Sequence, residues 1–217
     1  MIKKKILFFY RKIINYKQAY PKYIAVGSAN KQTLNLCKKI KPKYYCEIGF
    51  HEGHTLKEVL KILPNEAKID IFDFQDKCDK IKNSIPGLFK KKIKAYGNSY
   101  KFLDNYNNSL YKVWIKNKKK PLYDYIFLDG SHVFTVDCLT FFLADKLLKK
   151  GGIIDFDDFN WSIKSSPSMN PAALRASKLM YSGEQINQKG VKMIIDGFIK
   201  NSPLYKEIIK NKAYKKI

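Results

Sequence analysis

The chain has 217 residues, 45% of them hydrophobic, which is enough for one sizeable α/β core and short for two full domains. Its four cysteines show no C-x-x-C pairing, which argues against a disulfide framework or a zinc site and favours reduced thiols in a cytoplasmic protein. The formal net charge of +23 favours association with anionic partners such as nucleic acid, phospholipid or sugar phosphates.

Residues 1–40 are predicted to form a basic helical extension that packs on the core. Ile2, Ile6, Phe9 and Ile13 share one face of a helix whose other face is basic. The apolar run before Arg11 is too short for a signal peptide, and no stretch approaches the roughly 18 apolar residues of a membrane span. Such a helix could instead close a dimer or lie on an anionic membrane surface.

Alternating strand and helix patterns follow this extension. We expect strands at 44–48, 69–74, 93–96, 123–128 and 153–156, helices at 55–63, 76–85, 99–116 and 134–148, a helical segment over 191–199, and a closing hairpin of 205–209 and 213–217. Asn98 or Ser99 is expected to cap the helix that runs to Lys116. The alternation predicts a mostly parallel sheet with helices on both faces.

A glycine-spaced turn follows the first strand. Glu47, Gly49 and Gly53 form the pattern Glu-x-Gly-x-x-x-Gly, which differs from the dinucleotide fingerprint. Glycines let the backbone turn tightly and approach a ligand, and a strand-end carboxylate can accept hydrogen bonds from it. The segment therefore indicates a nucleotide-cofactor loop, although a plain strand-turn-helix junction would carry similar residues.

Acidic residues and one histidine follow two later strands. Asp129-Gly130-Ser131-His132 ends the strand at 123–128, and Asp157-Asp158 ends the strand that begins after Gly151-Gly152. In an open parallel sheet the ligand crevice lies at the carboxyl ends of the strands. We therefore expect these groups to converge there.

With these residues in place, the chain resembles the class I S-adenosylmethionine-dependent methyltransferases. It is most similar to the metal-dependent O-methyltransferases of macrolide sugars and to their cephalosporin-biosynthesis relatives, over roughly residues 40 to 160. The resemblance implies a Rossmann-like, doubly wound, seven-stranded and mostly parallel sheet with a C-terminal antiparallel hairpin. It also makes residues 41–217 the methyltransferase domain.

The resemblance implies S-adenosylmethionine as cofactor. Glu47 and the amides of its loop would face the methionine part, Asp73 would hold the ribose hydroxyls, and Asn98 would read the adenine amine. The expected cofactor residues are Glu47, Gly49, Phe50, Gly53, Thr55, Asp73, Asn98, Ser99 and Asp129. The alternatives are an exposed strand-end role for Glu47 and a capping role for Asn98, and Asp70 and Asp76 lie near Asp73.

The resemblance also implies a metal-assisted methyl transfer to an alcohol. Asp129, Asp157 and Asp158 offer oxygen ligands suited to Mg²⁺. His132, with Asp129 beside it as the second catalytic residue, would take the proton of the acceptor hydroxyl. Alternatively, the aspartate pair caps the next helix and the histidine is structural.

The acceptor is expected to be a sugar or another small polyhydroxylated molecule. Trp161 could stack on a sugar ring and Lys164 could bind a phosphate, although an ordinary surface loop uses the same residues. A nucleic-acid (RNA) methyltransferase would suit the positive charge, although lysine spread over almost every segment is also typical of an AT-rich codon bias. Two further alternatives are a non-catalytic S-adenosylmethionine-binding protein of the same fold and assembly into a homo-oligomer.

Overall fold

A computed structural model describes residues 27–101 and 103–217. The expected helix over the first 14 residues lies outside this range. Residues 31–40 form the helix α3 (Lys31–Ile40), which packs Leu36 and Cys37 into the core. The division into an extension of residues 1–40 and a domain of residues 41–217 stays a prediction.

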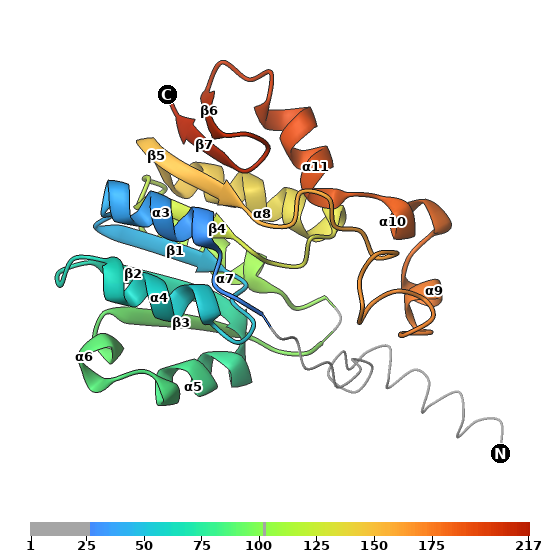
Figure 1. Cartoon of the computed structure of the whole chain (residues 1–217), viewed down its shortest axis with the longest axis horizontal. Coiled ribbons are helices and arrows are strands. Elements are labelled where there is room, and N and C mark those ends of the chain that lie inside the picture. Colours follow the sequence, from blue (N-terminus) through green and yellow to red (C-terminus); the bar gives the residue numbers. More distant parts are fainter. Residues whose placement is uncertain (1–26, 102) are drawn as a thin grey trace.

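A seven-stranded sheet forms the centre of the protein (Figure 1). Its strands are β1 (Tyr44–Ile48), β2 (Lys68–Phe74), β3 (Ile93–Asn98), β4 (Tyr123–Leu128), β5 (Leu148–Phe156), β6 (Tyr205–Ile209) and β7 (Ala213–Lys216). The order is β3-β2-β1-β4-β5-β7-β6, in which β1 to β5 pair in parallel and β7 runs antiparallel to both β5 and β6. The predicted fold class, including the closing antiparallel hairpin, is confirmed.

Helices cover both faces of the sheet, because alternate side chains of the buried strands point to opposite sides. One face carries α3, α4 (His54–Ile62), α5 (Gln75–Ser84) and α6 (Gly87–Lys90). The other carries α7 (Tyr106–Lys116), α8 (Phe134–Leu147) and α11 (Gly190–Ile194), which continues into the π-helical turn η1 (Ile195–Ile199). Two short helices, α9 (Ser177–Met180) and α10 (Gly183–Asn187), lie in the connection from β5 to α11.

The predicted start of the helix after β3 is wrong. The helix α7 begins at Tyr106, and its N-cap is Asn105, whose side chain accepts from the Asn107 amide. The carboxylate of Asp104 accepts hydrogen bonds from the backbone amide and the hydroxyl of Ser99, at 2.7 and 2.6 Å. These bonds hold the residues after β3 in a loop, so neither Asn98 nor Ser99 caps the helix.

Candidate active site

The loops that follow β1, β4 and β5 meet at the carboxyl ends of the parallel strands. Backbone amides join their starting points: Gly49 donates to the Phe72 carbonyl, Asp129 to the Ile48 carbonyl and Asp157 to the Leu128 carbonyl, at 2.7 to 2.9 Å. The expected convergence of the glycine loop with the two acidic loops is therefore observed. This end of the sheet is where ligands bind in open α/β folds.

The loop between β1 and α4 needs its two glycines. Gly49 and Gly53 have φ angles of +73° and +71°, and a Cβ atom on Gly49 would lie 2.1 Å from the Asp129 carbonyl oxygen. The Asp73 carboxylate accepts from the amides of Phe50 and His51, each at 3.0 Å. Asp73 therefore holds the loop in shape, while the lone pairs of its two oxygens leave room for a further donor.

Gly49→Ala is expected to lower the free energy of unfolding by about 1–3 kcal/mol and to weaken cofactor binding, because the added methyl group forces β1 away from the loop after β4. Gly151→Ala is the matched control, since Gly151 also has a positive φ, +82°, but has open space where a Cβ atom would lie. Chemical denaturation and calorimetric titration measure both effects. An equal effect of the two substitutions would mean that backbone strain alone, and not the close approach of the two loops, makes glycine necessary at position 49.

Glu47 is buried at the end of β1, so it is not an exposed strand-end acid. Its side chain accepts a hydrogen bond from the Tyr45 hydroxyl at 2.7 Å, and its second oxygen, Oε1, is buried with no hydrogen-bond partner among the described residues. Burial raises the pKa of Glu47 to about 8; the Tyr45 hydrogen bond opposes this rise, and nearby aspartates, Asp73 foremost, add to it. An unpaired buried carboxyl oxygen is costly and suits a cationic ligand group.

The other predicted cofactor residues divide into two groups. Asn98 donates from its amide nitrogen to the Ser99 and Asp104 carbonyls, and its buried Oδ1 has no partner in the described part of the chain. This oxygen is free to accept from a ligand amine. In contrast, Ser99 is bonded to Asp104, the Thr55 hydroxyl accepts from the Asn30 amide, and the Phe50 side chain is buried in the core. The backbone amides of Phe50 and Ser99 are also engaged, because they donate to Asp73 and Asp104.

His132 contacts two of the predicted metal aspartates. Its Nε2 atom lies 3.7 Å from Asp129 Oδ1 and 3.5 Å from Asp158 Oδ2, while Asp157 accepts from the Asn30 side-chain amide at 3.0 Å. Burial and the charge of Asp157 raise the pKa of Asp129 well above its ordinary value, and burial likewise raises the pKa of Asp158. Like charges at short range account for part of both shifts.

The backbone at this cluster is strained. His132 and Asp158 have φ angles of +58° and +54°, a region that residues with side chains rarely adopt. Such conformations persist only where the surroundings enforce them, and they concentrate at functional sites. Here the amide of His132 donates to Asp137 at 2.7 Å, and Asp137 also accepts from the Tyr106 and Ser131 hydroxyls.

Asp137 and Asn30 are positioning residues that sequence reasoning missed. An acidic residue in the first turn of α8 signals an N-terminal capping group, so Asp137 was open to detection as a holder of the preceding loop. No local pattern links Asn30 to Asp157, which is 127 residues away. That contact arises only when α3 packs beside the end of β5.

The donor chemistry of the acidic cluster fits Mg²⁺, which prefers carboxylate oxygens. Within residues 27–101 and 103–217, however, no three histidine, cysteine or acidic side chains are arranged to hold a metal ion. In this structure the cluster consists of the His132 imidazole in contact with the carboxylates of Asp129 and Asp158.

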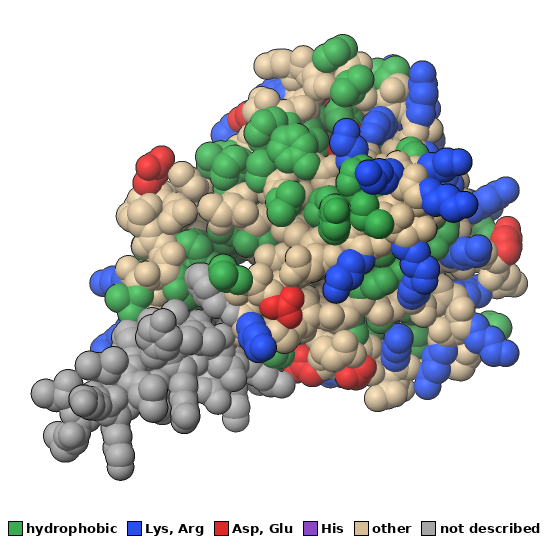
Figure 2. Space-filling model, turned by 180° about the vertical axis from the view of Figure 1, so that it is seen from behind, with side chains coloured by type: hydrophobic (Ala, Val, Ile, Leu, Met, Phe, Trp, Pro, Cys, Tyr) green, Lys and Arg blue, Asp and Glu red, His purple; other side chains and the backbone are tan. Residues whose placement is uncertain are grey.

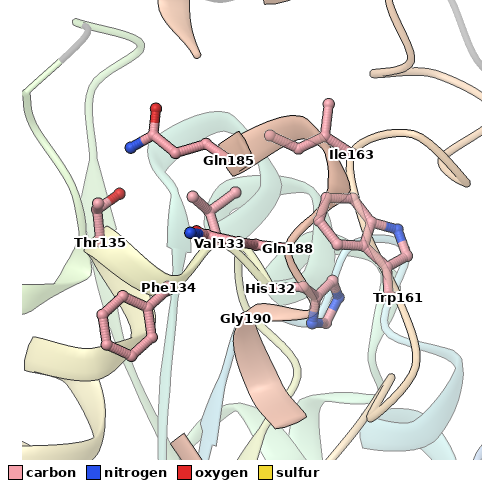
Figure 3. A pocket seen from close by; sticks show the side chains of 9 residues that line it. All are labelled: His132, Val133, Phe134, Thr135, Trp161, Ile163, Gln185, Gln188 and Gly190. Carbon is pink, nitrogen blue, oxygen red and sulfur yellow. The ribbon is translucent and has the colours of Figure 1, made fainter. Parts of the chain in front are cut away.

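A small hollow with a cavity volume of about 10 Å³ lies beside His132 (Figure 3). The start of α8, the Trp161 loop and α10 form its walls, and Gln185 and Gln188 contribute amide side chains. The Trp161 ring lies 5.4 Å from the His132 ring, at 57° to it. Trp161, predicted only as a loop residue that could meet the acceptor, therefore stands next to the predicted base.

The sheet order, the glycine loop after β1 and the carboxylate at the end of β2 define the class I S-adenosylmethionine-dependent methyltransferase fold. A family model described as O-methyltransferase matches residues 4–191. The chain belongs to the O-methyltransferase family and is an S-adenosylmethionine-dependent methyltransferase. No curated protein matches the chain.

Solved structures of O-methyltransferases share the fold. They include an O-methyltransferase of Bacillus cereus in complex with S-adenosylhomocysteine (16% identity, TM-score 0.57, covering 98% of this chain and 90% of the other). A candidate caffeoyl-CoA O-methyltransferase of Staphylococcus aureus has 15% identity and a TM-score of 0.57, covering 98% and 91%. A candidate O-methyltransferase of Klebsiella pneumoniae has 14% identity and a TM-score of 0.59, covering 94% and 88%.

These findings confirm the predicted class and the fold, and the metal-dependent group is compatible with the family. At such low identity the structural matches establish the fold alone, so the acceptor and the metal do not follow from them. None of the helices in the described part of the chain has the length and apolar character needed to cross a bilayer. The assignments of individual site residues stay predictions that the geometry can support.

Proposed function

We propose that the protein transfers a methyl group from S-adenosylmethionine to a hydroxyl of a sugar or another small polyhydroxylated acceptor, with Mg²⁺ as a cofactor. The observation that carries the proposal is the position of His132, which contacts Asp129 and Asp158 and lines the pocket next to Trp161. A base, two carboxylates and an aromatic wall in one place suit proton removal from a bound alcohol.

The cofactor is proposed to bind across the ends of β1, β2 and β3. The free oxygen of Glu47 would accept from the ammonium of the methionine part, and Asp73 would hold the ribose while it fixes the glycine loop. The free oxygen of Asn98 would accept from the adenine amine. When bound, the cofactor supplies a methyl group on a positively charged sulfur.

His132 is the proposed general base. The carboxylates of Asp129 and Asp158 at its Nε2 atom favour a proton on that nitrogen, which leaves Nδ1 as the basic one. Nδ1 has no hydrogen-bond partner among the described residues. After proton removal, the two carboxylates stabilise the imidazolium, as in other carboxylate-supported histidines.

Asp129, Asp157 and Asp158 would hold Mg²⁺. Bound there, it would lower the pKa of an acceptor hydroxyl as a Lewis acid. A bound cation would also stabilise the carboxylates, because burial together with the charge of Asp157 raises the pKa of Asp129 and of Asp158. We therefore expect Mg²⁺ to raise the melting temperature of the wild-type protein.

The pocket supports a polyhydroxylated acceptor. An indole ring and amide side chains suit a ring that carries several hydroxyls, because the apolar face stacks on the indole while Gln185 Nε2 donates and Gln188 Oε1 accepts. The other amide atoms of these glutamines bond to Ser182 and Glu184. A catechol acceptor is the second candidate, since the similar Staphylococcus aureus protein is described as a candidate caffeoyl-CoA O-methyltransferase. RNA is less well supported, because Asp129-Gly130-Ser131-His132 stands where base-modifying methyltransferases commonly have an Asn-Pro-Pro-aromatic or Asp-Pro-Pro-aromatic motif. A purely non-catalytic role is less well supported, because a binding protein needs no general base.

A radiolabel assay tests the proposal. Wild-type protein with labelled S-adenosylmethionine is offered free sugars, nucleotide sugars, catechol and RNA, each with Mg²⁺ and with a chelator. The expected result is methyl transfer to a sugar that stops on chelation. Transfer to RNA alone would favour the nucleic-acid alternative, and cofactor binding without transfer to any acceptor would favour the non-catalytic one. A cytoplasmic location and a homo-oligomeric state stay predictions.

A further inference from the structure

The outer surface of α7, α8 and η1 exposes five large hydrophobic side chains, which we call the helical face. They are Tyr111, Ile115, Leu139, Phe142 and Phe198, each between 40% and 52% exposed. The helix α8 packs against both α7 and α11, which continues into η1, so these side chains belong to one layer. Figure 2 shows hydrophobic side chains gathered on this side of the protein, with Lys and Arg side chains spread beside them.

The exposed stripe of α8 is apolar where a solvated helix would be charged. Thr135, Leu139 and Phe142 follow the spacing of one helix face, and Lys146 is the first charged residue on that stripe. The Phe142 and Phe198 rings meet edge to face at 5.1 Å, which joins α8 to η1. A contiguous apolar area of this kind marks an interaction surface more often than a scattered exposed leucine does.

Exposed lysines follow the side chains of the helical face along the chain. On α7, Lys112 and Lys116 follow Tyr111 and Ile115, and on α8, Lys146 follows Phe142. Lys200 follows Phe198 and is partly neutralised by Asp196. The nearby acids already have partners. Asp145 pairs with Lys216 at 2.7 Å and accepts from the Tyr205 hydroxyl, and Asp196 pairs with Lys192 and Lys200. The field at this surface is therefore positive and complementary to an anionic partner.

We propose that the helical face docks the protein on an anionic phospholipid bilayer. Apolar side chains with a basic rim suit the boundary between headgroups and acyl chains, where both kinds of contact are satisfied. A second copy of the chain would carry the same charge of +23 and would be repelled. RNA would use the lysines, but it offers nothing that would cover the aliphatic side chains of Ile115 and Leu139.

Vesicle flotation tests the proposal on the full chain. Binding is expected to phosphatidylcholine vesicles that contain phosphatidylglycerol and not to phosphatidylcholine alone. Because a protein of charge +23 is attracted to anionic vesicles by any basic surface, the deciding comparison is between variants. Leu139→Ser with Phe142→Ser is expected to weaken binding at least about tenfold. The control pair, Leu88→Ser with Leu179→Ser, removes two exposed leucines from α6 and α9 and is expected to leave binding unchanged.

A second pair covers the case in which the serine variant fails to fold. Lys112→Gln with Lys116→Gln should weaken binding more than Lys38→Gln with Lys39→Gln, which removes the same charge from α3 on the opposite face of the sheet. Equal losses from both lysine pairs, or no loss with Leu139→Ser and Phe142→Ser in a folded protein, would overturn the proposal. So would a dimer by light scattering that the serine pair abolishes, because a second copy would then occupy the helical face.

Discussion

His132→Ala is expected to lower kcat/KM for methyl transfer by about 10²–10⁴-fold, the usual contribution of a general base. The affinity for S-adenosylmethionine should change little, because the proposed cofactor contacts lie on Glu47, Asp73 and Asn98. Steady-state kinetics and calorimetric titration of the same preparation measure the two quantities. The pH profile is a further readout, since loss of the base should remove the acidic limb of the wild-type curve.

Asp158→Ala distinguishes catalysis from cofactor binding at the same cluster. It removes one of the two carboxylates that contact His132, so turnover should fall more than cofactor affinity. Asp79→Ala, at an exposed position on α5, is the matched control and should leave both unchanged. A folded Asp158→Ala protein that has lost its cofactor affinity would count against the assigned roles.

The affinity for S-adenosylhomocysteine is expected to fall as the pH drops below about 8, because burial raises the pKa of Glu47 to that value. The sign follows from linkage. A cationic ammonium binds the ionised carboxylate, so binding must release the proton that free Glu47 holds below its raised pKa. Between the pKa of the complex and that of the free protein, the affinity should fall about tenfold for each pH unit.

Glu47→Gln should weaken the binding of S-adenosylhomocysteine at pH 9 and should make its affinity less dependent on pH. Without ligand, the free energy of unfolding of the wild-type protein should fall as the pH rises from 4.5 to about 8, because the Glu47 carboxyl loses its proton at lower pH in the unfolded chain than in the folded protein. Glu47→Gln should remove this loss of stability. Glu66→Gln, at an exposed position, is the control. An affinity that is independent of pH in the wild type, or is unchanged in Glu47→Gln, would contradict the role of Glu47.

Sequence patterns predicted the architecture because short apolar-rich stretches, such as 125–128, alternate with helix-spaced segments bounded by turn residues. The convergence of Glu47, Asp129 and Asp158 could also be predicted, since the ends of parallel strands lie at one edge of the sheet. The start of α7 was mispredicted because an Asn-Ser pair is a good cap in isolation. The contact of Ser99 with Asp104, five residues later, overrides that preference.

The parts of the site that were missed depend on packing between distant segments. Asn30 reaches Asp157 only through the placement of α3, and Gln185 reaches the pocket only because the connection from β5 to α11 folds back over His132. The helix α10 itself was detectable, because Ser182 and Gln185 form a capping box. Its position beside the predicted base was not.

Titration of the wild-type protein with S-adenosylhomocysteine at pH 9 tests the account most directly, because it needs no acceptor and no metal. We predict one site with micromolar affinity that weakens as the pH is lowered. Absence of binding by a folded protein would contradict the cofactor site assigned to Glu47, Asp73 and Asn98.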